Sequence, residues 1–277
     1  MAQIKQTRVC LADFENAARG KISTETFEFW RNGADDEVTL RDNVLAFDKY
    51  KFRPRVLVDN IGQRSAATTV LGRPIRLPIG AAPSGMHKLA HDDGEIATAK
   101  ACADIGTIMI TSTNSSFIVE EIAAAAPSTR KWFQLYFQKD QSKTLNLIKR
   151  VERLSGYEAI CPTVDLAAIG NRRAQQRHRF ANDKAGNIKV DLNLMKSGGY
   201  SDVTAYLAGE VFNCEITWKD IDWLRSATAL PIILKGILTP QDARLAVEHG
   251  ASGIIVSNHG GRQLDSVQAT VCFESLS

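Results

Sequence analysis

Short apolar segments that end in polar residues alternate with segments of helical periodicity along most of this 277-residue chain. The apolar segments are rich in β-branched residues and bounded by turn residues, which favours fully buried parallel strands. They lie at 79–83, 107–113, 132–137, 159–165, 231–236 and 253–259. Helical periodicity is found between them, at 94–104, 143–154, 218–228 and 239–249. This alternation predicts an α/β fold with a parallel sheet.

Two parallel architectures compete for this pattern. A doubly wound sheet normally carries a Gly-x-Gly-x-x-Gly fingerprint after its first strand, and no such fingerprint follows any apolar segment here. A (β/α)8 TIM barrel places its chemistry at the carboxyl ends of many strands, where polar residues cluster in this chain. We therefore predict one domain, with a helical N-terminal segment over 1–60 and a barrel over 61–277. A polar, glycine-containing stretch near 174–202 is expected to be a mobile insertion.

Charge and hydropathy exclude several classes of partner. Lys and Arg number 34 against 31 Asp and Glu, and a formal net charge of +3 is too small for a nucleic-acid surface. No apolar run approaches the roughly 20 residues that span a bilayer. The five cysteines include no C-x-x-C pair, so we expect no metal site and no disulfide framework. We see no targeting signal, and the expected location is cytoplasmic or peroxisomal.

Nearly every predicted strand ends in a hydrogen-bonding or ionisable residue. These strand-end residues are Ser84 and Gly85, Ser112, Gln134 and Tyr136, Thr163 and Asp165, Lys235, and Ser257 and His259. Each has an ordinary structural explanation alone, such as a helix cap for Ser112 or a side chain reaching solvent for Lys235. Together these explanations are weak, because buried strands rarely carry so many polar groups at one end. The pattern predicts a shared polar site.

The strongest single motif is Ser257-Asn-His-Gly-Gly-Arg-Gln263. A histidine directly after an apolar strand, beside glycines that admit a flat ligand, is typical of a general base, although a core histidine is the alternative. Arg262 has the planar fork that grips a carboxylate. For Arg172 and Arg173, which follow the Asp165 strand, ordinary surface charge is the stronger interpretation. Lys235 is suited to placing a positive charge beside an electron-accepting ring.

Six segments of the chain occur in a characteristic order. They are Phe52-Arg-Pro-Arg55, Ala82-Pro-Ser-Gly-Met86, Phe133-Gln-Leu-Tyr136, Thr163-Val-Asp165, Leu234-Lys-Gly236 and Ser257-Asn-His-Gly-Gly-Arg-Gln-Leu-Asp265. Together they resemble the FMN-dependent α-hydroxy acid oxidase/dehydrogenase family, which includes glycolate and lactate oxidases. The last segment is highly specific, and the others are specific as an ordered set. The resemblance runs from about Asp13 to Asp265.

The resemblance implies an FMN-linked barrel that oxidises an (S)-2-hydroxy acid to a 2-oxo acid. It implies three catalytic residues: His259 as the base, Asp165 supporting its cationic form, and Tyr136 at the reacting end of the substrate. The substrate-binding residues that it implies are Arg262, Arg172, Tyr136 and Phe29. The cofactor-binding residues that it implies are Pro83, Ser84, Gly85, Ser112, Gln134, Thr163, Lys235 and Ser257. Whether His259 removes the α-carbon proton or the hydroxyl proton stays open, as does the electron acceptor, with O2 a candidate.

Two substitutions depart from the family pattern. Phe29 stands where the family commonly has a tyrosine that touches the substrate carboxylate, which removes a donor worth about 1 kcal/mol. Asn114 stands where glycolate oxidases have a bulky tryptophan beside the substrate. We therefore expect a larger or specialised 2-hydroxy acid rather than glycolate.

Few residues follow Asp265, whereas the family has two further βα units there. We therefore expect an incomplete barrel of about six βα units, truncated at its C-terminus, without the usual phosphate-binding segment and with poor FMN binding. The alternative function is a catalytically impaired fragment or interaction module that holds no FMN. A barrel isomerase or aldolase with Lys235 as a Schiff-base lysine leaves His259 and Arg262 unexplained. A homo-oligomer, often a tetramer in the family, is also expected.

Overall fold

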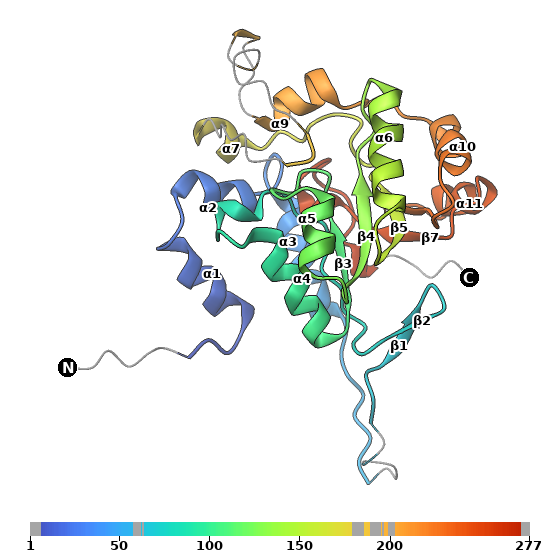
Figure 1. Ribbon diagram of the computed structural model, residues 1–277. Coiled ribbons are helices and arrows are strands. Elements are labelled where there is room, and N and C mark those ends of the chain that lie inside the picture. The colour runs from blue at the N-terminus through green and yellow to red at the C-terminus, as the bar shows by residue number, and fades with distance from the viewer. Residues whose placement is uncertain are drawn as a thin grey trace.

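Parallel strands lie at the centre of the molecule and helices cover their outer side (Figure 1). The computed structural model describes residues 7–57, 62, 64–178, 186–188, 195, 197–198 and 203–272. The central strands are β3 (Ile108–Thr111), β4 (Arg130–Leu135), β5 (Tyr157–Pro162), β6 (Ile233–Ile237) and β7 (Gly253–Val256). They form a β3-β4-β5 sheet and a β6-β7 sheet, all in parallel pairs.

Single parallel bridges extend this order at both sheets. Ala81 makes a parallel bridge with Met109 on the edge of β3 that does not pair with β4. The chain around Ala81 therefore runs beside β3 without forming a strand of its own. Ile160 pairs with Ile232, and Thr163 pairs with Lys235, which places β5 beside β6. Sequential parallel neighbours with helical crossovers are the arrangement of a (β/α) barrel. Among the described residues, β7 pairs on one side only, with β6.

An α-helix follows the Ala81 segment and each central strand from β3 to β6, and it returns the chain to the start of the next strand. These helices are α4 (Gly94–Ile105), α5 (Val119–Ala125), α6 (Gln141–Glu152), α10 (Trp218–Ala227) and α11 (Pro240–Glu248). Local sequence sets their ends. The Thr239 hydroxyl accepts from Asp242 N at 3.0 Å at the start of α11, with Pro240 in the first turn. Gly106, with φ of 77°, ends α4 in the left-handed conformation typical of a helix C-terminus.

Alternation along the strands separates two apolar regions. Phe133 and Leu135 of β4 point outward into a core shared with α6, α10 and α11. Trp132 of β4 and Cys161 of β5 point inward and pack with Ile75 from the hairpin below the strands. Because successive strand residues face opposite sides, Gln134 also points inward, at the carboxyl end of β4.

The N-terminal part of the chain is helical and packs near the carboxyl ends of the strands, where α3 contacts the turn at His259–Gly261. It comprises α1 (Leu11–Arg19), α2 (Thr24–Arg31), α3 (Val38–Leu45) and the 3-10 helix η1 (Ala46–Lys49). Asp265 binds the start of α3, accepting from Val38 N at 3.1 Å and from Thr39 N at 2.8 Å. This carboxylate therefore joins the first and last parts of the described chain.

Several features differ from the sequence-based expectations. The predicted strand at 79–83 is reduced to the bridge at Ala81, and helix α5 was not predicted. Nor was the antiparallel hairpin of β1 (Thr68–Val70) and β2 (Arg73–Ile75). The insertion predicted at 174–202 lies largely outside the described residues, and its described beginning belongs to α7 (Arg173–His178). The remaining elements are α9 (Val203–Tyr206), the π-helix η4 (Leu207–Val211) and the 3-10 turns η3 (His87–Leu89), η5 (His259–Gly261) and η6 (Thr270–Cys272).

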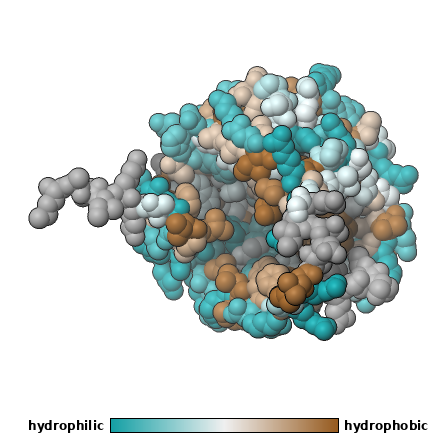
Figure 2. All heavy atoms as spheres, turned by 90° about the horizontal axis from the view of Figure 1, so that it is seen from below, coloured by the Kyte–Doolittle hydropathy of each residue, from teal (hydrophilic) through white to brown (hydrophobic). Residues whose placement is uncertain are grey.

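Apolar side chains are exposed near the hairpin end of the molecule. Residues 50–57 and 64–67 run away from the body as an extended arm (Figure 1). Phe52 and Leu57 are 100% exposed, and Phe47 and Ile79 are 62% and 68% exposed. Seen from this side, apolar residues lie in several groups around a central hollow (Figure 2). No helix in the described part of the chain has the length and apolar character needed to cross a membrane.

Gly72 and Gly261 have nearly the same φ but different surroundings, so replacing each by alanine distinguishes the cost of backbone strain from the cost of a steric clash. Gly261 and Gly72 have φ of 70° and 71°, but a Cβ on Gly261 would lie 2.6 Å from Leu40 N, whereas Gly72 faces open space. We expect Gly72→Ala to lower the free energy of unfolding by about 1 kcal/mol, which is the left-handed strain alone. We expect Gly261→Ala to lower it by about 3 kcal/mol, because α3 must also move. Urea unfolding measures both, and equal losses would mean that this contact is not tight.

Candidate active site

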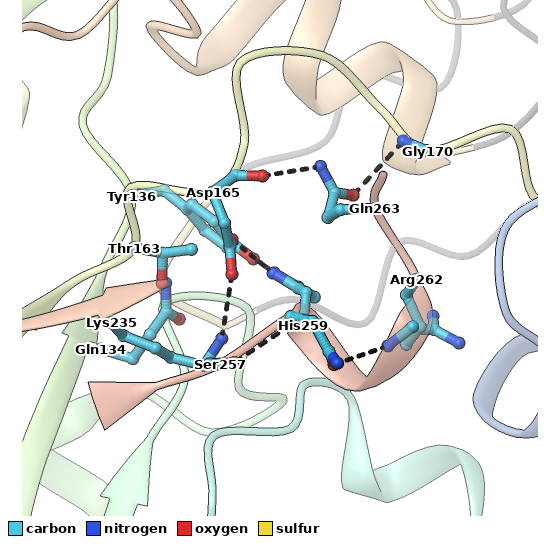
Figure 3. A network of polar contacts seen from close by, with 12 residues as sticks. Gln134, Tyr136, Thr163, Asp165, Gly170, Lys235, Ser257, His259, Arg262 and Gln263 are labelled. Atoms are coloured by element: carbon cyan, nitrogen blue, oxygen red, sulfur yellow. Dashed lines mark hydrogen bonds and ion pairs between the residues drawn. The ribbon is translucent and has the colours of Figure 1, made fainter. Parts of the chain in front are cut away.

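A cavity of about 320 Å³ opens at the carboxyl ends of the strands. It falls within the range of about 300–1,000 Å³ that is usual for small-molecule sites. The predicted residues that line it are Phe29, Pro83, Ser84, Gly85, Ser112, Gln134, Tyr136, Thr163, Arg172, Lys235, Ser257, His259 and Arg262. Asp165 does not line the cavity but lies directly behind His259 (Figure 3). The structure thus brings every predicted site residue to one place.

The carboxylate of Asp165 lies between a histidine and a lysine (Figure 3). Its Oδ1 is 2.6 Å from His259 Nδ1, and its Oδ2 is 3.7 Å from Lys235 Nζ. Burial opposes ionisation of Asp165, but the hydrogen bond from His259 and the positive charge of Lys235 hold its pKa below the usual value. Asp165 is therefore anionic, and the proton of the shared hydrogen bond belongs to His259 Nδ1.

The imidazole of His259 is neutral at physiological pH. Burial lowers its pKa to about 4; the hydrogen bond to Asp165 opposes this shift, and Lys235 adds to it. With Nδ1 donating to Asp165, the lone pair of Nε2 faces the cavity, 3.5 Å from the Tyr136 hydroxyl. Burial and the charge of Asp165 raise the pKa of Tyr136, so its hydroxyl keeps its proton. The pair therefore presents one proton acceptor and one donor to the cavity.

A backbone irregularity makes room for this arrangement. Gly236 has φ of 115° and lies at a register shift between β6 and β7. A Cβ at this position would be 2.7 Å from Asp165 Cβ. Only glycine therefore lets the Asp165 side chain lie beside β6, next to the ammonium of Lys235.

Three polar side chains form a hydrogen-bonded row across β3, β4 and β5. Gln134 Oε1 accepts from the Ser112 hydroxyl at 3.3 Å, and Gln134 Nε2 donates to the Thr163 hydroxyl at 2.9 Å. Thr113 N also donates to Gln134 Oε1, at 3.1 Å, which sets the orientation of the amide. The row gives the cavity one ordered polar wall.

Two guanidinium groups also line the cavity, those of the buried Arg172 and the half-buried Arg262. Arg262 donates to the backbone oxygen of Asn32 at 2.7 Å, and its Cζ lies 5.5 Å from the centre of the Phe29 ring. Arg172 donates to the backbone oxygen of Arg262 at 3.0 Å. Burial, and then the charge of Arg172, lower the pKa of Arg262 to about 9. Two neighbouring guanidinium cations at one cavity suit an anion such as a carboxylate.

The structure also shows which of the consecutive residues Arg172 and Arg173 lines the cavity and which lies on the surface. Arg172 is buried and lines the cavity, while Arg173 is exposed and pairs with Asp36 at 2.6 Å. Gln263 sets the position of Arg172, because its Oε1 accepts from Arg172 at 3.0 Å. Its amide nitrogen donates to the backbone oxygen of Asp165 at 3.1 Å, so one side chain connects the two loops (Figure 3).

Sequence reasoning missed one wall of the cavity. Thr204, Ala208 and Phe212 line it from the segment 203–212, and the rings of Tyr136 and Phe212 are 4.7 Å apart. This segment does not end a strand, so the strand-end pattern carried no signal for it. Further lining residues outside the predicted set are Trp30, Ala82, Met86, Asn114, Leu166, Ile169 and Gly260.

Comparisons with known proteins extend the picture. The model of a family described as FMN-dependent dehydrogenase matches residues 18–273. Glycolate oxidase 3 of Arabidopsis thaliana is 44% identical over 263 residues, which are 94% of this chain and 70% of that protein. Glycolate oxidase of Spinacia oleracea is 43% identical with the same coverage. A solved structure of mandelate oxidase has a TM-score of 0.85 and 36% identity, and the match covers 96% of this chain and 74% of that one.

The low pKa of His259 gives the chain a distinctive pH dependence of stability. In the unfolded chain a histidine titrates near pH 6.5, but folded His259 titrates near pH 4. Between these values only the unfolded state binds the proton, so stability falls as the pH falls from about 7.5 to 4.5. This contribution is on the order of 2–3 kcal/mol. We expect His259→Gln to remove it, flattening the melting temperature against pH over this range. An unchanged slope in His259→Gln would contradict a buried neutral imidazole.

Proposed function

The chain belongs to the FMN-dependent dehydrogenase family, and on that premise we propose that it oxidises an (S)-2-hydroxy acid to the corresponding 2-oxo acid. The observation that carries this proposal is a neutral imidazole and two guanidinium groups, one buried and one half-buried, that line the same cavity. A 2-hydroxy acid combines the two groups that such a site recognises: a carboxylate for the cations and an adjacent hydroxyl carbon for the base.

The polar wall of the cavity fits the edge of a flavin, which carries both hydrogen-bond donors and acceptors. We propose that Ser112, Gln134 and Thr163 contact this edge. Lys235 Nζ has Asp165 at 3.7 Å and no closer acceptor in the described chain, so its ammonium keeps donors for a ligand. FMN, when bound, accepts the two electrons that the substrate loses, and Lys235 stabilises the negative charge that results.

The loop 83–85 forms the other part of the proposed cofactor site. A Cβ on Gly85 would lie 3.0 Å from Asn114, so the loop packs against the neighbouring strand end without side-chain bulk. We propose that Pro83, Ser84 and Gly85 contact the cofactor through backbone atoms, and that Ser257 completes the site beside Lys235. All four residues line the cavity.

The remaining residues act on the substrate. We propose that Arg172 and Arg262 bind the carboxylate and that the Tyr136 hydroxyl donates to the reacting end. His259 Nε2 then accepts a proton, either from the α-carbon or from the hydroxyl group. Asp165 stabilises the imidazolium that forms, because its anionic oxygen already holds Nδ1 at 2.6 Å. Inside a buried site these fixed charges act more strongly than they would in water.

We further propose a substrate larger than glycolate. Phe29, Leu166, Ile169 and Phe212 give the cavity an apolar side, and Asn114 occupies less space than the tryptophan that the family resemblance suggested. Mandelate oxidase, a structural relative, has been solved with (S)-mandelic acid. An aromatic or extended side chain on the 2-hydroxy acid therefore suits this site better than a hydrogen atom.

The electron acceptor, the oligomeric state and the cellular location are also proposals. O2 is the proposed electron acceptor, the enzyme is proposed to assemble as a homo-oligomer, and its location is proposed to be cytoplasmic or peroxisomal. A chain that holds no FMN, acting as an impaired fragment or an interaction module, is the alternative that the following experiment separates.

Flavin reduction tests the proposed reaction directly. The purified chain is reconstituted with FMN and titrated without oxygen against (S)- and (R)-2-hydroxy acids. We expect only the (S) acids to bleach the flavin absorbance, and His259→Asn to slow this bleaching by about 100-fold or more, because the proton acceptor is lost. Absence of FMN binding would favour the alternative, and undiminished reduction in His259→Asn would show that the base is a different residue.

Asn114 tests the proposed substrate size. We expect Asn114→Trp to lower kcat/KM for mandelate relative to glycolate by about tenfold or more, because the indole ring fills the space of the substrate side chain. Asn114→Ala is the matched control, since it removes the same amide without adding bulk, and we expect it to keep the preference for mandelate. Equal effects of Trp and Ala on the ratio would mean that Asn114 does not bound the substrate side chain.

A further inference from the structure

We propose that Asn43, on helix α3, is a positioning residue that holds His259 in place through a reciprocal amide pair with Asn258. The inference deepens the proposed function, because it rests on His259 being the base. Asn43 does not line the cavity and precedes Asn258 by 215 residues, so it acts on the site only through its neighbour.

The two amides form a closed pair. Asn43 Nδ2 donates to Asn258 Oδ1 at 3.0 Å, and Asn258 Nδ2 donates to Asn43 Oδ1 at 2.7 Å. Asn258 Oδ1 also accepts from Gly261 N at 3.1 Å, and Asn258 Nδ2 also donates to the backbone oxygen of Gln268 at 3.2 Å. Both amide hydrogens and both lone pairs of Asn258 are therefore used. Asn258 is only 4% exposed, so water does not replace a lost partner easily.

The backbone after Asn258 needs such support. His259, Gly260 and Gly261 have φ of 58°, 67° and 70°, three consecutive residues in the left-handed region. For the non-glycine His259 this conformation costs about 1 kcal/mol or more, and it persists only where the surroundings require it. Gly261 N donates to the backbone oxygen of Asn258 at 3.0 Å and to Asn258 Oδ1 at 3.1 Å, and these two hydrogen bonds close the turn over His259. The amide of Asn258 thus sets the direction in which the imidazole leaves the backbone.

Helix α3, which carries Asn43, is held in place by hydrogen bonds to residues 265–267. Asp265 caps its first turn, and Thr39 is fastened to Val267 by two hydrogen bonds, at 3.1 Å and 3.3 Å. The backbone of Leu40 lies so close to Gly261 that no Cβ fits between them. The helix is therefore attached on both sides of the turn that carries His259, and Asn43 is its polar contact with Asn258.

Asn43→Leu keeps the size of the side chain and removes both hydrogen bonds. It leaves one donor and one acceptor of Asn258 unmet in a buried place, which favours rotation of that amide and release of Gly261 N. We expect the imidazole to lose its alignment with Asp165. A displacement of about 1 Å suffices for a large loss of rate, so we expect kcat to fall by about tenfold or more with little change in KM.

A spectroscopic readout separates positioning from general support. In the ¹⁵N-histidine-labelled chain without substrate, the Nδ1 proton of His259 is expected far downfield, because its hydrogen bond to Asp165 is short and charge-assisted. Its loss in His259→Gln assigns the signal. We expect Asn43→Leu to abolish this signal or move it upfield, and Asn43→Asp to do the same, because it sets two oxygens against each other. Asn43→Ala removes both hydrogen bonds without placing a large apolar side chain there, and provides a second variant should Asn43→Leu fail to fold.

Thr39→Val is the matched control on the same helix. It removes the contacts of α3 with Val267 and leaves the amide pair intact, so we expect lower stability with an unchanged His259 signal. An unchanged signal and kcat in the Asn43 variants would overturn the inference, as would the same loss of signal in Thr39→Val. Failure of the unaltered protein to oxidise any 2-hydroxy acid counts against the proposed function alone, because the resonance still reports on His259.

Discussion

The buried carboxylate of Asp165 is the group around which the carboxyl end of the sheet is organised. An anion at 10% side-chain exposure is costly unless cations or donors surround it, and here His259 and Lys235 supply them from two other strand ends. The three groups meet only because β5, β6 and β7 are parallel neighbours and because Gly236 leaves space for the Asp165 side chain. In return, Asp165 orients the imidazole and leaves its other nitrogen facing the cavity.

A second electrostatic constraint lies opposite this carboxylate. Arg172 and Arg262 are neighbouring like charges, and the backbone oxygens of Asn32 and Arg262 and the side-chain oxygen of Gln263, which accept hydrogen bonds from them, are neutral groups. Such a pair is most stable when an anion joins it. The N-terminal helices take part in this constraint, since the end of α2 supplies a carbonyl to Arg262 and α3 contacts the turn that holds His259. The strand ends supply most polar groups of the cavity, and the helical segment contacts Arg262 and the turn of His259.

Much of the architecture and of the site was predictable from local patterns. The strands from β3 to β7 and the helices α4, α6, α10 and α11 match the predicted apolar and periodic segments, with small shifts at their ends. The family resemblance is confirmed by the match over residues 18–273. The sequence did not predict the elements that lack a periodic pattern of apolar residues. Ala81 makes only one bridge, the hairpin is too short to show alternation, and Phe212 reaches the cavity from a segment that ends no strand.

By itself, the sequence determined which polar residues meet at the cavity, because parallel strands that end in polar groups bring those groups to the same end of the sheet. It did not determine which of Arg172 and Arg173 turns inward, since adjacent residues differ only in the direction that the fold gives them. Nor did it indicate that Asn43 contacts Asn258 or that Gly236 faces Asp165. Those contacts join residues far apart in the chain. Only the packing of α3 and the register of β6 against β7 bring them together.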